Sequence, residues 1–249
     1  MPSTNITMLQ TVAKGLGDLK NEMVFVGGSV AELYVDNSAA SDIRPTLDVD
    51  CVIALSSKRA HAELEENLRA RKFQNDTSQG APICRWVYQD IKVDVMPTDP
   101  NVLGFTNIWY EDGVNTKITK TLPDGQDIFV FPPEYYIAAK FEAHKGRGGN
   151  DLRQSHDFED IIYIFDNCPD MLDNIRNANE TVKTHLKHEC QALLENKDLT
   201  EGVESALPYG SDEESTYIIL ELIRSIAEIE LSTFLKKNKL EKKNVTYLC

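Results

Sequence analysis

With 249 residues, the chain is long enough to bury the core of one large domain or of two modest ones. Its composition, 41% hydrophobic and 27% charged residues, is ordinary for a globular protein. The formal net charge of −14 argues against a long nucleic-acid footprint, because an acidic surface repels phosphates and nucleic-acid binders usually carry basic faces.

Other sequence features bear on cellular location. No apolar run approaches the roughly 20 residues that a membrane span needs, and residues 1–5 lack the pattern of a signal peptide. We therefore expect a cytoplasmic protein without membrane association. The five cysteines include no CxxC pair, so the sequence predicts neither a disulfide framework nor a structural zinc site. Cys51 is expected to be a small core residue.

From about residue 20 to 131 the sequence predicts a mixed α/β region. We expect strands at Met23–Val26 and Leu47–Leu55 and helices at Ser29–Tyr34 and Ser57–Arg71. Along the second strand the expected inward residues are Leu47, Val49, Cys51, Ile53 and Leu55. Two hairpins are predicted, Ile83–Tyr88 with Ile91–Met96 around Gln89-Asp90, and Thr116–Leu122 with Ile128–Phe131 around Pro123-Asp124-Gly125-Gln126.

From residue 132 onward the pattern is helical. Pro132-Pro133 suits the first turn of a helix over Glu134–His144, and a second helix is expected over Asp151–Phe165. Apolar residues then recur at helical spacing from 172 to 193, and a long helix is marked by Ile218, Leu222, Ile223, Ile226 and Ile229. The predicted class is α+β, with a mixed-sheet domain over residues 1–131 and a helical domain over residues 132–249.

The strongest chemical signal is a set of aspartates on two predicted strands. Asp48 and Asp50 are two residues apart in a strand, so they point to the same face. Such adjacent carboxylates are costly unless a cation lies between them, and Mg²⁺ prefers hard oxygen ligands. If the strand of Asp94 pairs nearby, all three side chains share one edge and can hold one Mg²⁺ or two. A solvated D-x-D face is the alternative.

A glycine turn precedes these aspartates. Gly27-Gly28-Ser29 stands between a strand and a helix, where glycine permits close approach of a ligand and free N–H groups can meet phosphate. Ser29 is also expected to be the N-cap of that helix. This turn, the paired aspartates and the later strand aspartate together favour nucleotidyl transfer.

These motifs, G-G-S, then R-x-T-x-D-x-D from Arg44 to Asp50, then Asp94, resemble those of the polymerase-beta-like nucleotidyltransferase superfamily. Within it the chain is most similar to the AbiEii and MenT type toxin nucleotidyltransferases. The resemblance covers roughly residues 20 to 167 and includes Lys140 and an acidic segment with Asp157. The family usually carries a basic residue immediately before that aspartate, where this chain has His156.

The resemblance implies a role for each motif. The turn Gly27-Gly28-Ser29 would bind the nucleotide, with Gly28 and Ser29 holding the β- and γ-phosphates. Asp48 and Asp50 would bind Mg²⁺, and Asp94 would bind it too or deprotonate the acceptor hydroxyl.

The remaining roles concern charge. Lys140 would neutralise the triphosphate, Asp157 would orient Lys140 or contact the nucleotide, and Arg44 would pair with one of the paired aspartates or with phosphate. Read from the residues alone, Lys140 could be a snorkelling surface lysine and Asp157 a solvated helix residue. Arg147 is a weaker phosphate candidate.

Two other features carry less weight. His185 and His188 lie three apart on a predicted helix as a possible metal pair, for which a solvated polar face is the alternative. The lysine-rich segment 236–243 could touch RNA or a partner, although such runs are usually solvated.

The expected activity is transfer of a nucleoside monophosphate from ATP or GTP with Mg²⁺ to an acceptor hydroxyl, with release of pyrophosphate. The resemblance implies a toxin–antitoxin or phage-defence toxin that acts on tRNA and has a cognate antitoxin. A protein or a small molecule of the antibiotic type is the alternative acceptor. A non-catalytic nucleotide-binding regulatory module is a further alternative.

Overall fold

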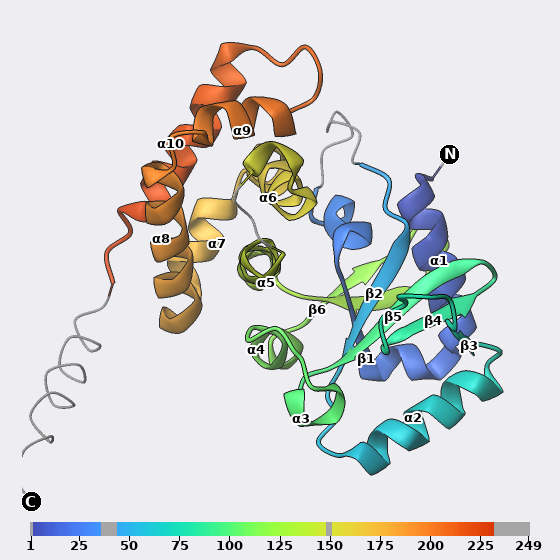
Figure 1. Cartoon of the computed structure of the whole chain (residues 1–249). Coiled ribbons are helices and arrows are strands. Elements are labelled where there is room, and N and C mark those ends of the chain that lie inside the picture. Colours follow the sequence, from blue (N-terminus) through green and yellow to red (C-terminus); the bar gives the residue numbers. More distant parts are fainter. Residues whose placement is uncertain (1, 36–43, 148–150, 232–249) are drawn as a thin grey trace, which may run out of the picture.

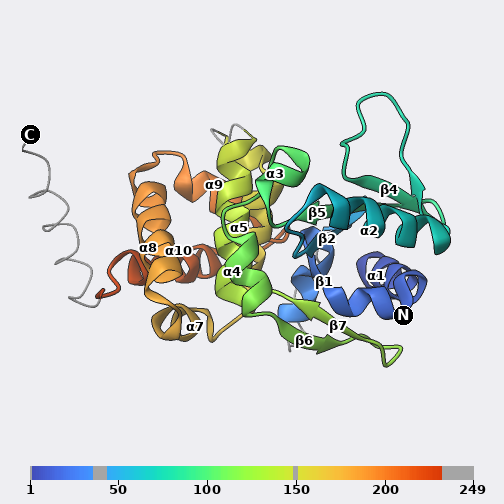
Figure 2. The same cartoon turned by 90° about the horizontal axis from the view of Figure 1, so that it is seen from below.

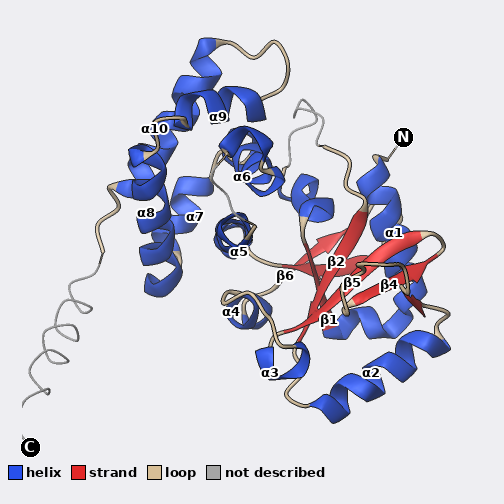
Figure 3. Ribbon diagram, in the orientation of Figure 1, coloured by secondary structure: helices blue, strands red, loops and turns tan. Residues whose placement is uncertain are grey.

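The computed structural model describes residues 2–35, 44–147 and 151–231 (Figure 1). A seven-stranded mixed sheet, ordered β3-β4-β5-β2-β1-β7-β6, is flanked by helices (Figure 3), and every described element after β7 is helical. The predicted α+β class is therefore confirmed. The strands are β1 (Met23–Val26), β2 (Asp48–Ile53), β3 (Gln74–Asn75), β4 (Arg85–Tyr88), β5 (Ile91–Pro97), β6 (Ile118–Thr121) and β7 (Asp127–Val130).

The pairing at the centre of the sheet places the aspartate strands side by side. β2 pairs antiparallel with β1 and parallel with β5, and in this register Asp50 lies opposite Asp94. β4 returns antiparallel to β5 through Gln89 and Asp90, whose φ angles of 48° and 63° match the twist of a tight hairpin. Both predicted hairpins, this one and β6–β7, are confirmed.

Strand β2 is shorter than the predicted segment 47–55. It spans Asp48–Ile53, so Leu47 and Leu55 lie beyond its ends. Leu47 is 83% exposed, which makes its predicted inward orientation wrong, whereas Leu55 still packs partly against the core. Val49 and Cys51 are fully buried, as predicted.

The helices form two groups. Helices α1 and α2 lie beside the sheet, whereas α5 to α10 gather on the opposite side of the molecule in both views (Figures 1 and 2). Helix α5 begins at the predicted proline pair and connects the sheet to the second group. The α-helices are α1 (Thr4–Leu16), α2 (Lys58–Ala70), α3 (Pro100–Leu103), α4 (Tyr110–Asn115), α5 (Pro133–Gly146), α6 (His156–Asn167), α7 (Met171–Asn177), α8 (Glu180–Glu195), α9 (Leu199–Ala206) and α10 (Glu213–Ala227), and the 3₁₀ segments are η1 (Gly17–Glu22), η2 (Gly28–Tyr34) and η3 (Leu152–Gln154).

Several helices differ from the prediction in their boundaries. The segment after the glycine turn is the 3₁₀ helix η2. The helix predicted over 151–165 is divided, because the hydroxyl of Ser155 accepts a hydrogen bond from the Phe158 amide and begins α6 there. The periodic run from 172 to 193 forms two helices, since Asn179 caps a new start at α8. Helices α1, α3, α4 and α9 were not predicted. The lysine-rich segment 236–243 lies outside the described residues.

One hydrophobic cluster extends through the described chain, from Ile6 in α1 to Ile229 after α10. It includes the inner faces of the central strands and of α5 and α6, so the sheet and the helices that carry the candidate site are packed together. The domain division at residue 131 stays a prediction. None of the described helices has both the length and the apolar character needed to cross a membrane.

Candidate active-site cleft

The predicted aspartates lie on one face of neighbouring strands. Asp48 and Asp50 alternate along β2, and Asp94 is opposite Asp50 on β5. Asp50 and Asp94 line a cleft of about 240 Å³ whose other walls come from α5 and from the region of Phe105 and Tyr110. The pairing that the prediction required between the two aspartate strands is therefore present.

The carboxylate of Asp50 is the one that stands without a counter-ion. Within the described parts of the chain, no hydrogen bond or ion pair reaches it. Burial, together with the negative charges of Asp48 and Asp94, raises the pKa of Asp50 to about 7. Gly27 makes room for this side chain, because a Cβ atom there would lie 1.9 Å from an Asp50 oxygen. A cation placed here would remove the electrostatic cost.

Arg85 is a functional candidate that the sequence analysis missed. Its Nε and Nη2 atoms each lie 2.7 Å from a different oxygen of Asp94, and Nη2 is also 3.0 Å from Oδ2 of Asp48. The hairpin register pairs Arg85 with Asp94 directly. That register follows from the predicted two-residue turn at Gln89-Asp90 by counting back along both strands, so the sequence did contain the signal.

Lys140 projects from α5 into a buried acidic cluster. Its ammonium lies 2.5 Å from Oδ2 of Asp160 and 3.3 Å from Oδ1 of Asp157, and all three residues are at most 9% exposed. Burial alone would lower the pKa of Lys140, but the charges of these aspartates outweigh it and the pKa is raised. The alternatives of a snorkelling lysine and a solvated Asp157 are therefore wrong. Asp160 was not singled out in the sequence.

Arg147 adds a positive group at the mouth of the cleft. It lines the cleft, and Nη1 is 2.7 Å from Oδ2 of Asp157, although the side chain is 73% exposed. An exposed guanidinium that is tied at one nitrogen retains donors for an anionic ligand. The weaker phosphate candidate of the sequence analysis thus lies beside Lys140.

The three residues of the glycine turn do not all face the cleft. Gly27 lines the cleft, whereas Gly28 and Ser29 are buried. The N-cap of η2 is Gly27 and not Ser29, because the helical segment begins at Gly28. In the described structure the Ser29 hydroxyl is buried without a hydrogen-bond partner. A phosphate-binding role for the turn stays a prediction.

Arg44 does not pair with Asp48 or Asp50. Its guanidinium instead lies 3.1 Å from Glu159 and 3.3 Å from Asp160 on α6. The expectation of a bond to the paired aspartates is therefore wrong. Because Asp160 also holds Lys140, Arg44 belongs to the second acidic cluster of the site.

The remaining lining of the cleft near Asp94 is largely apolar. Phe105 is 42% exposed there. The lining of the cleft thus combines carboxylates and cations with apolar side chains that suit a planar or apolar group. The apolar lining residues include Pro82, Cys84, Met96, Phe105 and Tyr110.

The three aspartates fit a hard divalent cation such as Mg²⁺ by their donor chemistry, and the uncompensated Asp50 carboxylate supports that fit. Their spacing is wider than a single shared ion requires. Among the described His, Cys, Asp and Glu residues, the three aspartates do not form a group whose ligand atoms all lie within 4.8 Å of one another. The one such group of three is Glu142, His185 and Glu189. The guanidinium of Arg85 lies between Asp48 and Asp94 and contacts both of them.

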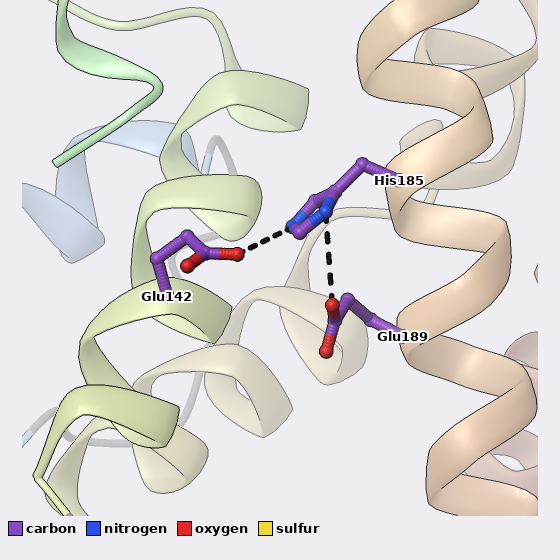
Figure 4. Close-up of side chains that lie close together, drawn as sticks. All are labelled: Glu142, His185 and Glu189. Carbon is purple, nitrogen blue, oxygen red and sulfur yellow. Dashed lines mark ion pairs between the residues drawn. The ribbon is translucent and has the colours of Figure 1, made fainter.

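The group of Glu142, His185 and Glu189 lies between α5 and α8 (Figure 4). Each glutamate is 3.6 Å from a ring nitrogen of His185, and the ammonium of Lys145 is 2.7 Å from both glutamates. His185 is only 14% exposed, so the alternative of a solvated face is wrong for it, while His188 is exposed and takes no part. We interpret this group as an ion-pair cluster that joins the two helices.

No protein-family model matches the chain, and no curated protein is significantly similar to it in sequence. Among solved structures, an antigenic nucleotidyltransferase-like protein from Paracoccidioides brasiliensis is 18% identical with a TM-score of 0.46, over 81% of this chain and 92% of that one. JHP933 from Helicobacter pylori is 11% identical with a TM-score of 0.44, over 99% of this chain and 100% of that one. At these identities and TM-scores, the likeness assigns no role to any residue of this chain.

Proposed function

We propose that the protein is a metal-dependent nucleotidyltransferase that moves a nucleoside monophosphate from a nucleoside triphosphate to an acceptor hydroxyl. One observation carries the proposal: Asp50 and Asp94 are opposite each other on adjacent strands and open onto a cleft that also receives Lys140 and Arg147. Carboxylates for a cation and cations for a polyphosphate are thereby placed around one space.

In this reaction Asp48, Asp50 and Asp94 would hold one or two Mg²⁺ ions. Bound there, Mg²⁺ supplies charge neutralisation at the reacting phosphate and orients the nucleotide. Asp94 lies opposite Asp50 on the adjacent strand, where the two carboxylates can share a cation, and this favours the role of ligand over that of base. Of the two roles that the sequence left open for Asp94, we therefore propose the first.

The remaining residues would bind the nucleotide. Lys140 and Arg147 would neutralise the triphosphate, with Asp157 holding both of them in place. The backbone of the turn at Gly27 and Gly28 would approach the phosphates. Because ion pairs orient Lys140 and Arg147 before the substrate binds, this preorganisation would itself contribute to catalysis.

The bond changes are those of an in-line displacement. The acceptor oxygen forms a bond to the α-phosphorus, the bond from that phosphorus to the α,β-bridging oxygen breaks, and pyrophosphate leaves with the bonding electron pair. The hydroxyl proton passes to a cleft carboxylate.

For the acceptor, we propose a tRNA end, and for the biological role, a toxin with a cognate antitoxin. The resemblance of the motifs supports both. The charge of −14 limits the RNA contact to a short terminus at the cleft, since a longer footprint would meet an acidic surface. A hydroxyl on a protein or small molecule is the alternative acceptor.

The test is an incubation of purified protein with Mg²⁺, α-labelled or γ-labelled nucleoside triphosphates, and separated RNA, protein and small-molecule fractions of a cell extract. We expect transfer of the α label but not the γ label into the RNA fraction, with release of pyrophosphate. Asp48→Ala should abolish labelling, while Asp18→Ala, an exposed aspartate on η1, should not. The proposed activity would be refuted if, in each of the fractions, wild type incorporated no more label than Asp48→Ala.

A further inference from the structure

Arg85 contacts two of the three aspartates that we propose as metal ligands. It uses two nitrogens to contact both oxygens of Asp94, and one of these nitrogens also reaches Asp48 on the next strand. The guanidinium is only 18% exposed, so its position is fixed by packing as well as by charge. It therefore lies between two of the three candidate metal ligands.

This position brings Arg85 into conflict with a cation. A divalent ion shared by Asp48 and Asp94 would have to use an Asp94 oxygen that already accepts a hydrogen bond from the guanidinium, whereas at Asp48 only Oδ2 is engaged in this way. It would also place two positive charges beside the charge of Arg85, and like charges at such distances repel strongly where water is scarce. The guanidinium therefore opposes the binding of an ion that bridges the same pair of carboxylates.

We propose that Arg85 competes with the divalent cation for Asp48 and Asp94, and so sets the cation concentration at which the site fills. The bond to Asp48 is the one that breaks, because it is the longer contact and is made by one nitrogen, whereas Asp94 is held by two. This inference rests on the proposed function, since it takes the aspartates to be the metal ligands.

Removal of Arg85 would have the opposite effect, weaker cation binding, if Arg85 only oriented the metal ligands. A group that merely fixes a metal ligand raises affinity, and its removal typically costs 10- to 100-fold in metal binding. Such a partner normally leaves the metal-facing oxygen free. Arg85 contacts both oxygens of Asp94, so competition is the effect that its geometry supports.

The experiment is a Mn²⁺ titration of nucleotide-free protein, followed by electron paramagnetic resonance of the free ion. Arg85→Gln removes the charge and should tighten Mn²⁺ binding by roughly 10-fold or more. Arg59→Gln, which removes an equal charge from an exposed arginine on α2, should leave the affinity unchanged. Asp50→Asn should weaken binding in every background, which places the ion at the aspartates.

A second variant, Arg85→Lys, controls for the possibility that Arg85→Gln does not fold. Arg85→Lys keeps the charge but cannot bridge both carboxylates, so it should tighten binding to a smaller degree than Arg85→Gln. Equal or weaker binding in the Arg85 variants, with binding still dependent on Asp50, overturns the competition while leaving the proposed metal site intact. If wild type and both variants bind no Mn²⁺, with or without a nucleoside triphosphate, the proposed function and this inference fail together.

Discussion

Replacing Asp50 with asparagine should stabilise the protein in the absence of divalent cations, by an amount that increases with pH. The pKa of Asp50 is raised to about 7 in the folded chain, first by burial and then by the charges of Asp48 and Asp94, against 3.8 for an ordinary aspartate. Below about pH 4 the group is protonated in both folded and unfolded states and costs nothing. Between about pH 4 and 7 the unfolded chain releases this proton and the folded chain retains it, so stability falls.

The size of the effect follows from these two pKa values. Each pH unit between them costs about 1.4 kcal/mol, so the advantage of Asp50→Asn should increase by about 2–3 kcal/mol from pH 5 to pH 8. Above about pH 7 it should level off, because Asp50 is then ionised in both states. Asparagine keeps the shape of the side chain and removes the titration.

The assay is urea denaturation of wild type, Asp50→Asn and the control Asp18→Asn at pH 5, 6, 7 and 8 with EDTA present. Adding Mg²⁺ at pH 8 should stabilise wild type more than Asp50→Asn. A stability advantage that does not change with pH, or a variant that is less stable than wild type at pH 8, would show that Asp50 is not a strained carboxylate.

Four further predictions concern the cleft and its surroundings. Gly27→Ala should destabilise the protein by about 1–3 kcal/mol from its φ of 75° alone, and by more through the clash with Asp50, whereas Gly125→Ala, also at positive φ but with open space, should show only the backbone cost in urea denaturation. Lys140→Met should lower the free energy of unfolding by about 3–5 kcal/mol at neutral pH, because it leaves buried carboxylates without their cation, and an effect below about 1 kcal/mol would contradict the buried ion pairs. Lys145→Ala should allow Zn²⁺ to raise the melting temperature more than in wild type, since it frees the oxygens of Glu142 and Glu189, which with His185 form a group of three ligand atoms within 4.8 Å of one another; equal shifts would show that the ammonium does not keep a metal ion out of that cluster. Calorimetry should detect nucleoside triphosphate binding with Mg²⁺ and little with EDTA, and equal affinity in both, without turnover, would favour a regulatory module.

Local patterns predicted the strands and the hairpins well because those features depend on neighbouring residues. Turn residues fixed both hairpins, and a period of two placed Asp48 and Asp50 on one face. The failures are at element ends, in helix boundaries and in whole elements that the sequence did not predict, namely β3, α1, α3, α4 and α9. Leu47 is apolar yet exposed, since the strand starts after it, and the break at Ser155 depends on a side-chain cap inside an otherwise apolar periodic run.

The site was predictable only in part. Its metal-binding side follows from strand alternation, and Arg85 could have been found from the hairpin register. The pairing of Arg44 with Asp160 joins residues 116 positions apart, and Lys140 acquires its role through the packing of α5 against α6. Such long-range contacts leave no local pattern in one sequence, so the second acidic cluster emerges only from the structure.

The charge balance of the cleft explains why a nucleotide and its metal would bind together. Among the described residues, Lys140, Arg147 and Arg85 are each already paired with aspartates, and Asp50 is the carboxylate left unpaired. A triphosphate alone would bring negative charge towards Asp50, and a cation alone would have to displace Arg85. A metal–triphosphate complex reduces both obstacles. Its metal ion screens the phosphates from the carboxylates, and its phosphates attract Lys140 and Arg147. Filling the site in one step is therefore the arrangement that this distribution of charges favours.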